Sequence, residues 1–263
     1  MTKQGGSPYG WSTHSQYLGC ARKASLRAEA GDSQPGDEDN LDVGTLTHKC
    51  LELFYTQGLA TTAGLVAEGY PEESCKEAHR LFTAYADKFK GHDLGTTLHV
   101  EKTLPCEPPE GENLADIGAM TTFKERCYNL AAHLGIAPAL ITCRSDLIIL
   151  LTKDDCDGIY HSRNVETTPG IWIVDHKTAA RRDSLGEEKW NHDCQMSLNF
   201  ALWNACHKLW PAEYPAPCEG VLVNVIYKTK EVGFETFVVR PTADQISAAL
   251  GAVHLAAKIA ADP

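Results

Sequence analysis

Hydrophobic residues follow two different periods along the chain, and these predict helices and strands in a mixed order. Apolar positions spaced three or four residues apart predict helices over 15–27, 41–57, 71–90, 123–134, 191–209 and 242–261. Short, dense apolar runs predict strands over 98–104, 146–152, 170–176, 220–228 and 235–240. This order is typical of an α/β fold in which helices flank a central mixed β-sheet, with an N-terminal helical elaboration.

The length favours a single domain. With 263 residues, 43 % of them hydrophobic, the chain can bury a substantial core. We expect one domain over 1–263, with 1–95 mainly helical and 96–263 forming the sheet core. The polar stretch 153–158 between two predicted strands lacks the ligand spacing of a calcium loop, so we interpret it as a hairpin loop.

Neither a membrane span nor a secretion signal is evident in the sequence. No stretch approaches the roughly 18 apolar residues that a membrane helix needs. The first six residues, Met-Thr-Lys-Gln-Gly-Gly, contain no apolar signal segment. We therefore expect a cytoplasmic protein of a bacterial or phage-infected cell that makes no membrane contact.

The ten cysteines are spread along the chain and show no Cys-x-x-Cys pair. In a long chain without an export signal, reduced and mostly buried thiols are the favoured interpretation. A cysteine-rich metal or redox protein is a further alternative, which the wide spacing of Cys194, Cys206 and Cys218 does not favour.

The net charge of −11 does not favour strong nonspecific binding to DNA. Six of the acids lie within residues 29–42, a segment that contains no lysine or arginine. A basic groove elsewhere remains compatible with this sum, because the electric field depends on where charges are placed.

Two acids and a lysine stand at the ends of neighbouring predicted strands. Asp146 opens one apolar run, and Asp175 and Lys177 close the next. Side chains alternate along a strand, so Asp175 and Lys177 share a side and His176 points to the other. Carboxylates bind Mg²⁺, Mn²⁺ also tolerates imidazole, and the backbone carbonyl of His176 is a further oxygen ligand. Taken alone, Asp175 and Lys177 favour an ordinary surface ion pair, whereas together with Asp146 and Glu101 in order they favour a functional site.

Several motifs, in order, resemble those of the PD-(D/E)XK nuclease superfamily. They are Glu101, Ser145-Asp146-Leu147-Ile148, Val174-Asp175-His176-Lys177-Thr178 and Gln195-Met196-Ser197-Leu198. The RecB-like branch, which includes phage exonucleases and CRISPR-associated adaptation nucleases, is the most similar. Residues 44–49 resemble its helix with a metal-binding histidine, and residues 15–23 resemble its N-terminal Cys-Pro-Arg-Lys segment. The resemblance spans residues 12–240 and implies a restriction-endonuclease-like core.

The resemblance also implies roles for particular residues. It implies that His48, Glu101, Asp146, Asp175 and the backbone carbonyl of His176 bind the metal, with Mg²⁺ or Mn²⁺ as the cofactor. Catalysis falls to Lys177, together with Glu101, Asp146, Asp175 and Gln195. DNA contacts fall to Arg22, Lys23 and Gln195, and Glu52, one helical turn from His48, is a candidate partner of the metal ligands.

The chain departs from the family pattern at three places, and the first is Ala21, which follows Cys20 where the family segment has proline. Family members often carry Gln-x-x-x-Tyr, but position 199 is Asn199 and the neighbouring aromatic residue is Phe200. Members with an iron–sulfur cluster use an N-terminal cysteine and three closely spaced cysteines near the C-terminus. Cys20 corresponds to the first, but no cysteine follows Cys218, so we expect no cluster in this chain.

These patterns predict a metal-dependent deoxyribonuclease. The resemblance favours exonuclease action on DNA ends during phage or bacterial recombination, repair or processing. The alternative is a catalytically inactive nuclease-fold module that binds DNA or protein. The expected partner is DNA, and a second copy of the chain or a recombination or replication protein is a further candidate.

Overall fold

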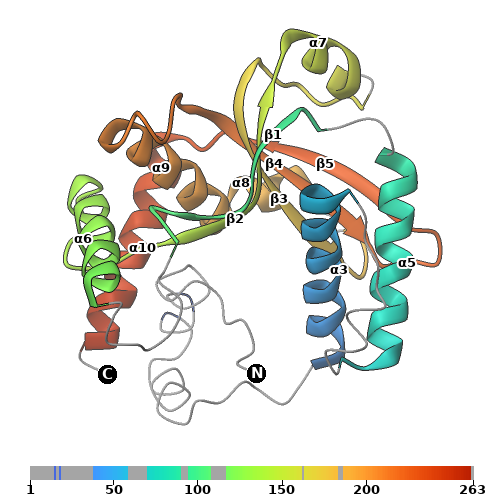
Figure 1. Cartoon of the computed structure of the whole chain (residues 1–263), viewed down its shortest axis with the longest axis horizontal. Helices are drawn as coiled ribbons and strands as arrows, with labels where there is room; N and C mark the ends of the chain where they lie inside the picture. Colours follow the sequence, from blue (N-terminus) through green and yellow to red (C-terminus); the bar gives the residue numbers. More distant parts are fainter. Residues whose placement is uncertain are drawn as a thin grey trace.

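A five-stranded mixed β-sheet forms the centre of the molecule. The computed structural model describes residues 15, 18, 38–58, 70–89, 94–107, 117–161, 163–182 and 186–261. The strands lie side by side in chain order: β1 (Thr96–Leu104), β2 (Cys143–Leu151), β3 (Gly170–Ala179), β4 (Cys218–Tyr227) and β5 (Gly233–Val239) (Figure 1). The pairs β1–β2, β2–β3 and β4–β5 are antiparallel, and β3–β4 is parallel. The predicted mixed sheet is confirmed.

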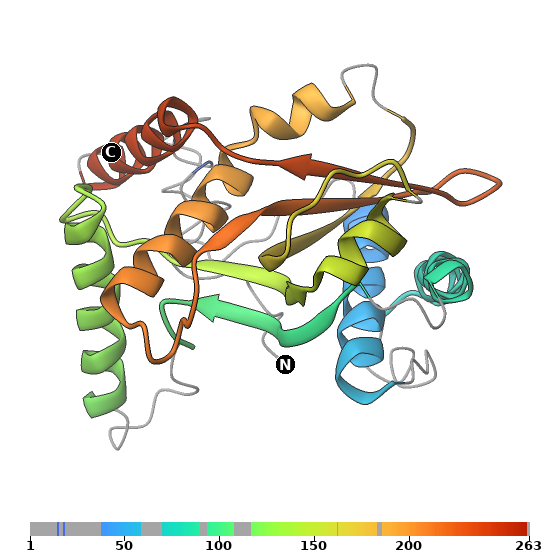
Figure 2. The same ribbon diagram turned by 90° about the horizontal axis from the view of Figure 1, so that it is seen from above.

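Two groups of helices cover opposite faces of this sheet (Figures 1 and 2). On one face lie α6 (Ile117–His133), α9 (Cys194–Leu209) and α10 (Ala243–Ala261), and α3 (Glu38–Gln57) and α5 (Glu72–Phe89) lie on the other. The short helix α8 (Glu187–Asn191) precedes α9 in the crossover between the parallel strands β3 and β4. Among the described helices, none combines the length and apolarity needed to cross a bilayer.

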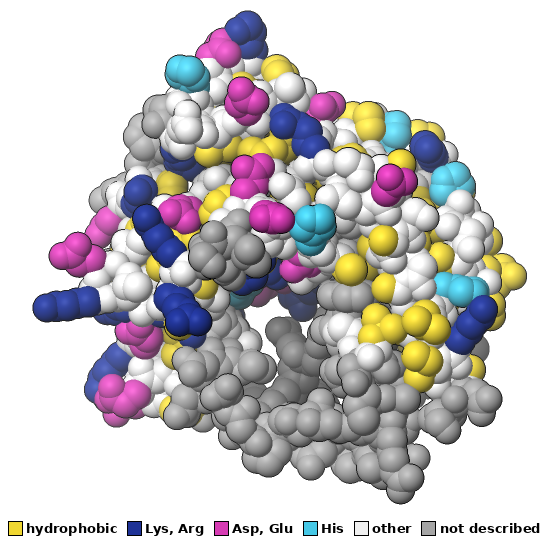
Figure 3. All heavy atoms as spheres, turned by 180° about the vertical axis from the view of Figure 1, so that it is seen from behind, with side chains coloured by type: hydrophobic (Ala, Val, Ile, Leu, Met, Phe, Trp, Pro, Cys, Tyr) yellow, Lys and Arg dark blue, Asp and Glu magenta, His cyan; other side chains and the backbone are white. Residues whose placement is uncertain are grey.

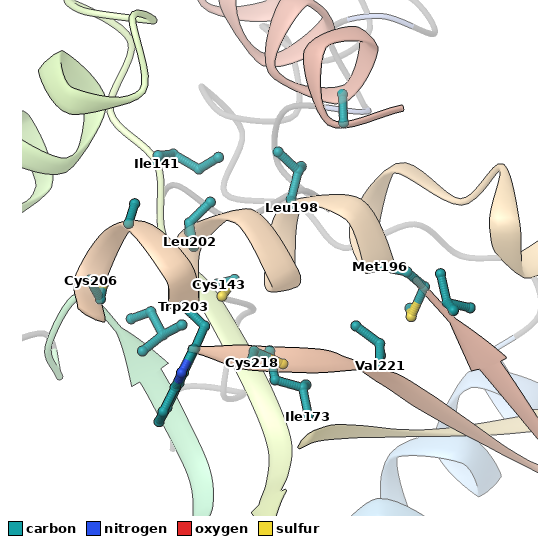
Figure 4. Packing of buried hydrophobic residues seen from close by; sticks show 14 of the residues in the cluster. Ile141, Cys143, Ile173, Met196, Leu198, Leu202, Trp203, Cys206, Cys218 and Val221 are labelled. Atoms are coloured by element: carbon teal, nitrogen blue, oxygen red, sulfur yellow. The ribbon is translucent and has the colours of Figure 1, made fainter. Parts of the chain in front are cut away.

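Alternating residues of β3 serve the two faces. Ile171 and Ile173 join the larger core beneath α9, whereas Trp172 and Val174 join a second cluster on the opposite face. Figure 4 shows how α9 packs on the strands from the larger core; the labelled side chains on α9 are Met196, Leu198, Leu202, Trp203 and Cys206. Because strand β3 is buried on both faces, its sequence is an almost unbroken apolar run.

Helices α3 and α5 form a third cluster with the end of β4. Leu46 of α3, with Leu81 and Tyr85 of α5, is fully buried there, and Ile226 of β4 joins them. These apolar positions follow the helical period of the sequence. The two helices lie beside the end of β3 that carries residues 175–177, so this packing decides what faces the candidate site.

The antiparallel pairing of β2 and β3 confirms the predicted hairpin, but the connection between the two strands is not an irregular loop. The predicted hairpin loop after β2 begins with a helical turn, α7 (Lys153–Asp155), followed by a π-helical turn, η2 (Cys156–Tyr160). Thr152 and Asp155 form a reciprocal capping box, which satisfies the first free backbone N–H groups and starts this helical segment. The predicted helix 191–209 is confirmed over Cys194–Leu209, and it starts later than predicted because Asp193 caps it.

Gly220 lies where β4 passes closest to its neighbours, and we expect Gly220→Ala to destabilise the fold. An added Cβ would lie 2.6 Å from Trp172 Cζ3 and 2.8 Å from the Val239 carbonyl oxygen. Overpacking of this kind costs about 1–3 kcal/mol of unfolding free energy. Gly251→Ala in α10, where an added Cβ meets nothing within 4 Å, should instead stabilise by about 0.5–1 kcal/mol. Denaturant unfolding of both variants measures the two changes in stability. Equal changes in the two variants would contradict the prediction.

Candidate metal-dependent active site

Three acids lie in a row across strands β1, β2 and β3. Val100 pairs with Leu147 and Lys102 with Ser145, so Glu101 of β1 stands opposite Asp146 of β2. Pairing between β2 and β3 ends at Leu147 and Val174, and Asp146 and Asp175 are the next residues on the two strands. The strands therefore separate where the acids begin, which leaves room for side chains between them.

Asp146 contacts residues of two other elements, β3 and α3. The backbone N–H of His176 donates to Asp146 Oδ2 over 2.6 Å, and His48 Nδ1 of α3 lies 3.3 Å from the same oxygen. Burial opposes ionisation of Asp146, but the imidazole side chains of His48 and His176 hold the pKa of its carboxyl well below its usual range. Asp146 in turn raises the pKa of His48 against the effect of burial. Asp146 is thus an anion held in one place.

Asp175, Lys177 and Gln195 form a triangle of contacts on the α9 side of β3. Lys177 Nζ lies 2.8 Å from Asp175 Oδ2 and donates to Gln195 Oε1 over 3.2 Å. Gln195 Nε2 donates to Asp175 Oδ1 over 3.3 Å. Gln195 is itself fixed at the start of α9, where its backbone N–H donates to the capping carboxylate of Asp193 over 2.7 Å. The lysine is therefore held from two sides.

The charges of this triangle keep the lysine protonated. Burial lowers the pKa of Lys177, but Asp175 and Asp146 outweigh that effect and raise the pKa above its ordinary value. Burial raises the pKa of Asp175, an effect that Lys177 partly offsets and Asp146 strengthens. The electrostatic influence of Asp146 on both residues indicates that the two acids belong to one site.

Glu101 joins the acids from the edge strand β1. Its φ of +51° is unusual for a residue other than glycine and marks local backbone strain. Its carboxylate pairs with Arg144, with Nε and Oε2 2.5 Å apart. Burial and the neighbouring Asp146 raise the pKa of Glu101 to about 7, although Arg144 opposes the shift. Glu52 also raises this pKa, which locates it near the row of acids.

The raised pKa of Glu101 predicts a pH-dependent stability of the metal-free protein. The folded state binds this proton more tightly than the unfolded chain, so the stability contributed by Glu101 falls as pH rises from about 4.5 to about 7. The Glu101→Gln variant has no carboxyl at this position and does not lose stability in this way. In EDTA we expect the free energy of unfolding of Glu101→Gln, relative to that of wild type, to increase by about 2 kcal/mol between pH 5 and pH 8. Urea unfolding at both values tests this, with Glu231→Gln on the exposed β4–β5 turn as control. A constant difference would contradict it.

The donor types of the site match a hard divalent cation. The carboxylates of Asp146, Asp175 and Glu101 are ligands of both Mg²⁺ and Mn²⁺, and the imidazole of His48 is a ligand that Mn²⁺ also tolerates. The N–H of His176 points at Asp146, and the carbonyl of the same strand residue points to the same side. Within the described parts of the chain, no three His, Cys, Asp or Glu side chains already stand together as a metal site. Instead, each acid has its own partners. Asp146 contacts two histidines and a backbone N–H, Asp175 contacts Lys177 and Gln195, and Glu101 pairs with Arg144.

The structure brings together most of the residues that the sequence singled out. His48, Glu101, Asp146, Asp175, Lys177 and Gln195 converge at this end of the sheet. Arg22, Lys23 and Cys20 lie outside the described residues. One expectation is corrected: the ring of His176 faces away from Asp175 but not from both acids, because its Nδ1 lies 3.7 Å from Asp146 Oδ2.

Sequence reasoning missed three groups around the site. Arg144 stands two residues before Asp146, a spacing that places both on one side of a strand and that we could have used. Asp193 precedes a helix as an acid at the N-cap, which is also a recognisable signal. Tyr85 reaches His176 from a helix 91 residues away, and no local pattern could have revealed it.

Acidic, basic and histidine side chains lie among one another on the face shown in Figure 3. On this face Lys and Arg alternate with Asp and Glu and do not form one broad basic area. The mixture agrees with the acidic balance of the whole chain.

Comparisons with known proteins leave the family open. The sequence matches no protein-family model and no curated protein. Among solved structures, the chain is similar to a protein from Eubacterium rectale described as a candidate exonuclease, with a TM-score of 0.47 and 12 % sequence identity. The alignment covers 96 % of this chain and 81 % of that one. A likeness of this degree carries no argument about the function of this chain.

Proposed function

We propose that the protein is a metal-dependent deoxyribonuclease that hydrolyses phosphodiester bonds. One observation carries the proposal: a row of three acids meets a lysine and a histidine where two strands separate. The order of motifs that resemble PD-(D/E)XK nucleases supports the same reaction. The resemblance alone favours exonuclease action on DNA ends, in phage or bacterial recombination, repair or processing.

The chain would bind Mg²⁺ or Mn²⁺ through Asp146 and Asp175, with His48, Glu101 and the His176 carbonyl as further ligands. When bound, such a cation activates water and neutralises charge at the phosphate. Asp146 is suited to this role, because the depressed pKa of its carboxyl keeps it ionised. Asp175 and Glu101 bring further negative charge, which a cation would balance.

Lys177 would act as a fixed positive charge beside the phosphate. Its raised pKa makes it a poor base at neutral pH, so the ammonium would steady the phosphate or orient the attacking water. Asp175 and Gln195 both contact Lys177 Nζ and so fix its position. Gln195 owes its own position to the helix cap at Asp193.

An inactive nuclease-fold module that binds DNA or protein is the second candidate. The acidic balance and the mixed charges on the face in Figure 3 favour it, because a nuclease acting on duplex ends usually carries a basic path. Asn199 also stands where related nucleases often carry tyrosine. A nuclease and an inactive DNA-binding module both take DNA as partner, so cleavage alone distinguishes these two.

A time course on three labelled DNA substrates tests the proposal. Linear duplex, linear duplex with blocked ends and closed circular duplex are incubated with Mn²⁺, and parallel reactions contain EDTA. We expect nucleotides to be released from open linear DNA only in the presence of Mn²⁺. Cleavage of circular DNA would overturn the exonuclease mode. DNA binding without any cleavage would overturn the nuclease and favour the inactive module.

A further inference from the structure

The ring of His176 is enclosed by three other rings on the α3 and α5 side of the sheet. It is only 2 % exposed. The ring centroids of His48, Tyr55 and Tyr85 lie 6.4, 6.1 and 5.6 Å from its own. A buried imidazole needs hydrogen-bond partners for both of its nitrogens, and the partners decide where its proton lies.

A chain of polar contacts runs from α3 through α5 to Asp146. The hydroxyls of Tyr55 and Tyr85 are 2.7 Å apart, and the Tyr85 hydroxyl lies 3.2 Å from His176 Nε2. On the other edge of the ring, His176 Nδ1 lies 3.7 Å from Asp146 Oδ2. Tyr85 is fully buried, so its hydroxyl has little access to water as an alternative partner.

The Asp146 carboxylate at the end of this series of contacts fixes which group donates and which accepts in each hydrogen bond. The carboxylate of Asp146 can only accept, so a favourable contact places the imidazole proton on Nδ1. In a neutral ring Nε2 then accepts, and the Tyr85 hydroxyl donates to it. Because the Tyr85 proton is used in this way, the Tyr55 hydroxyl donates to the Tyr85 oxygen. Burial raises the pKa of Tyr85 well above its usual value, which keeps its hydroxyl available as a donor.

Helix α3 acts on Asp146 through two side chains, one directly and one through other residues. His48 and Tyr55 are seven residues apart, so they lie two turns apart on one face of the helix. His48 approaches Asp146 directly, and Tyr55 acts on it through Tyr85 and His176. The same acid is thereby held by three groups: His48, the backbone N–H of His176 and the ring of His176.

We propose that Tyr85, supported by Tyr55, is a positioning residue that fixes His176 with its proton on Nδ1 and so orients Asp146 to bind a divalent cation. The cation part rests on the proposed function, whereas the state of His176 does not. Outer groups of this kind commonly change metal affinity about 10–100-fold when they are removed. A role confined to core packing would change stability alone.

Tyr85→Phe and Tyr160→Phe form a matched pair for the test. Tyr160 is equally buried, but its hydroxyl donates to the Leu94 carbonyl over 2.7 Å, so its proton is not used in the series of contacts to His176. Long-range ¹H–¹⁵N spectra of the protein in EDTA report the His176 tautomer, with His176→Gln to assign the signal. Calorimetric titration with Mn²⁺ alone, at one fixed pH, reports affinity. Tyr55→Phe, at the more accessible end of the chain, provides a second variant should Tyr85→Phe not fold.

We expect wild type and Tyr160→Phe to carry the proton on Nδ1 and to bind Mn²⁺ equally. Tyr85→Phe should lose the single tautomer and bind Mn²⁺ about 10-fold more weakly, and Tyr55→Phe should lose a smaller part. A wild-type proton on Nε2, or equal Mn²⁺ affinity in Tyr85→Phe and wild type, would overturn the positioning role and leave the proposed function intact. A wild type that does not bind Mn²⁺ would instead overturn the proposed metal site.

Discussion

Lys177→Ala is expected to lower the rate of DNA cleavage at least about 100-fold. The substitution removes the cation that Asp175 and Gln195 hold at the site, and removal of one preorganised charged donor costs roughly that much in rate. Binding of uncleaved DNA should change little, because one phosphate contact among many is lost. Digestion of labelled linear DNA with Mn²⁺ and a binding titration without metal measure the two effects.

Lys153→Ala is the matched control for that substitution. Lys153 pairs with Asp157 on the exposed turn after β2, remote from the acids. Its replacement should leave cleavage unchanged. Thermal unfolding of both variants separates loss of a reacting group from loss of the fold, because Lys177→Ala leaves the buried Asp175 without its cation. Turnover by a folded Lys177→Ala variant at the wild-type rate would remove the lysine from the mechanism.

Asp146→Asn is expected to abolish measurable binding of Mn²⁺ and, with it, cleavage. The carboxylate stands at the centre of the row of acids and is the group that His48 and His176 hold. An amide offers one neutral oxygen in place of an anion, and hard cations depend on anionic oxygen. Calorimetric titration with Mn²⁺ measures the loss directly, independently of any assay on DNA.

Asp157→Asn serves as the control for this second effect. Its carboxylate is exposed and pairs only with Lys153 among the contacts described. We expect wild-type affinity for Mn²⁺ and wild-type cleavage. If Asp146→Asn bound Mn²⁺ as tightly as this control, the metal would lie elsewhere and the assignment of Asp146 would be wrong.

The centre of the sheet could be predicted from the sequence because strands β3 and β4 are buried on both faces. The apolar run 170–174 has no polar position to suit a solvent-exposed face, and β4 is buried along 220–227 although it contains Asn224. The turn after β2 could not be foreseen in this way. Its acids suggested a loop, whereas the Thr152 and Asp155 side chains and the buried Cys156 and Tyr160 stabilise helical turns.

The site could be predicted in part, since its acids and lysine lie at strand ends in a simple alternation. Asp175 and Lys177 share a side, as the period of two requires. The surroundings of His176 depend on how α3 and α5 pack against the sheet, which is a property of the folded chain. The ion pair of Glu101 with Arg144 likewise depends on the register between β1 and β2.

Crystals grown with Mn²⁺, measured at a wavelength where manganese scatters anomalously, test the central claim most directly. The account predicts an anomalous peak between the carboxylates of Asp146 and Asp175, within coordination distance of both. Its absence from Asp146→Asn crystals treated identically would strengthen the assignment. Manganese density only at other positions, or none in crystals that hold saturating Mn²⁺, would contradict the account.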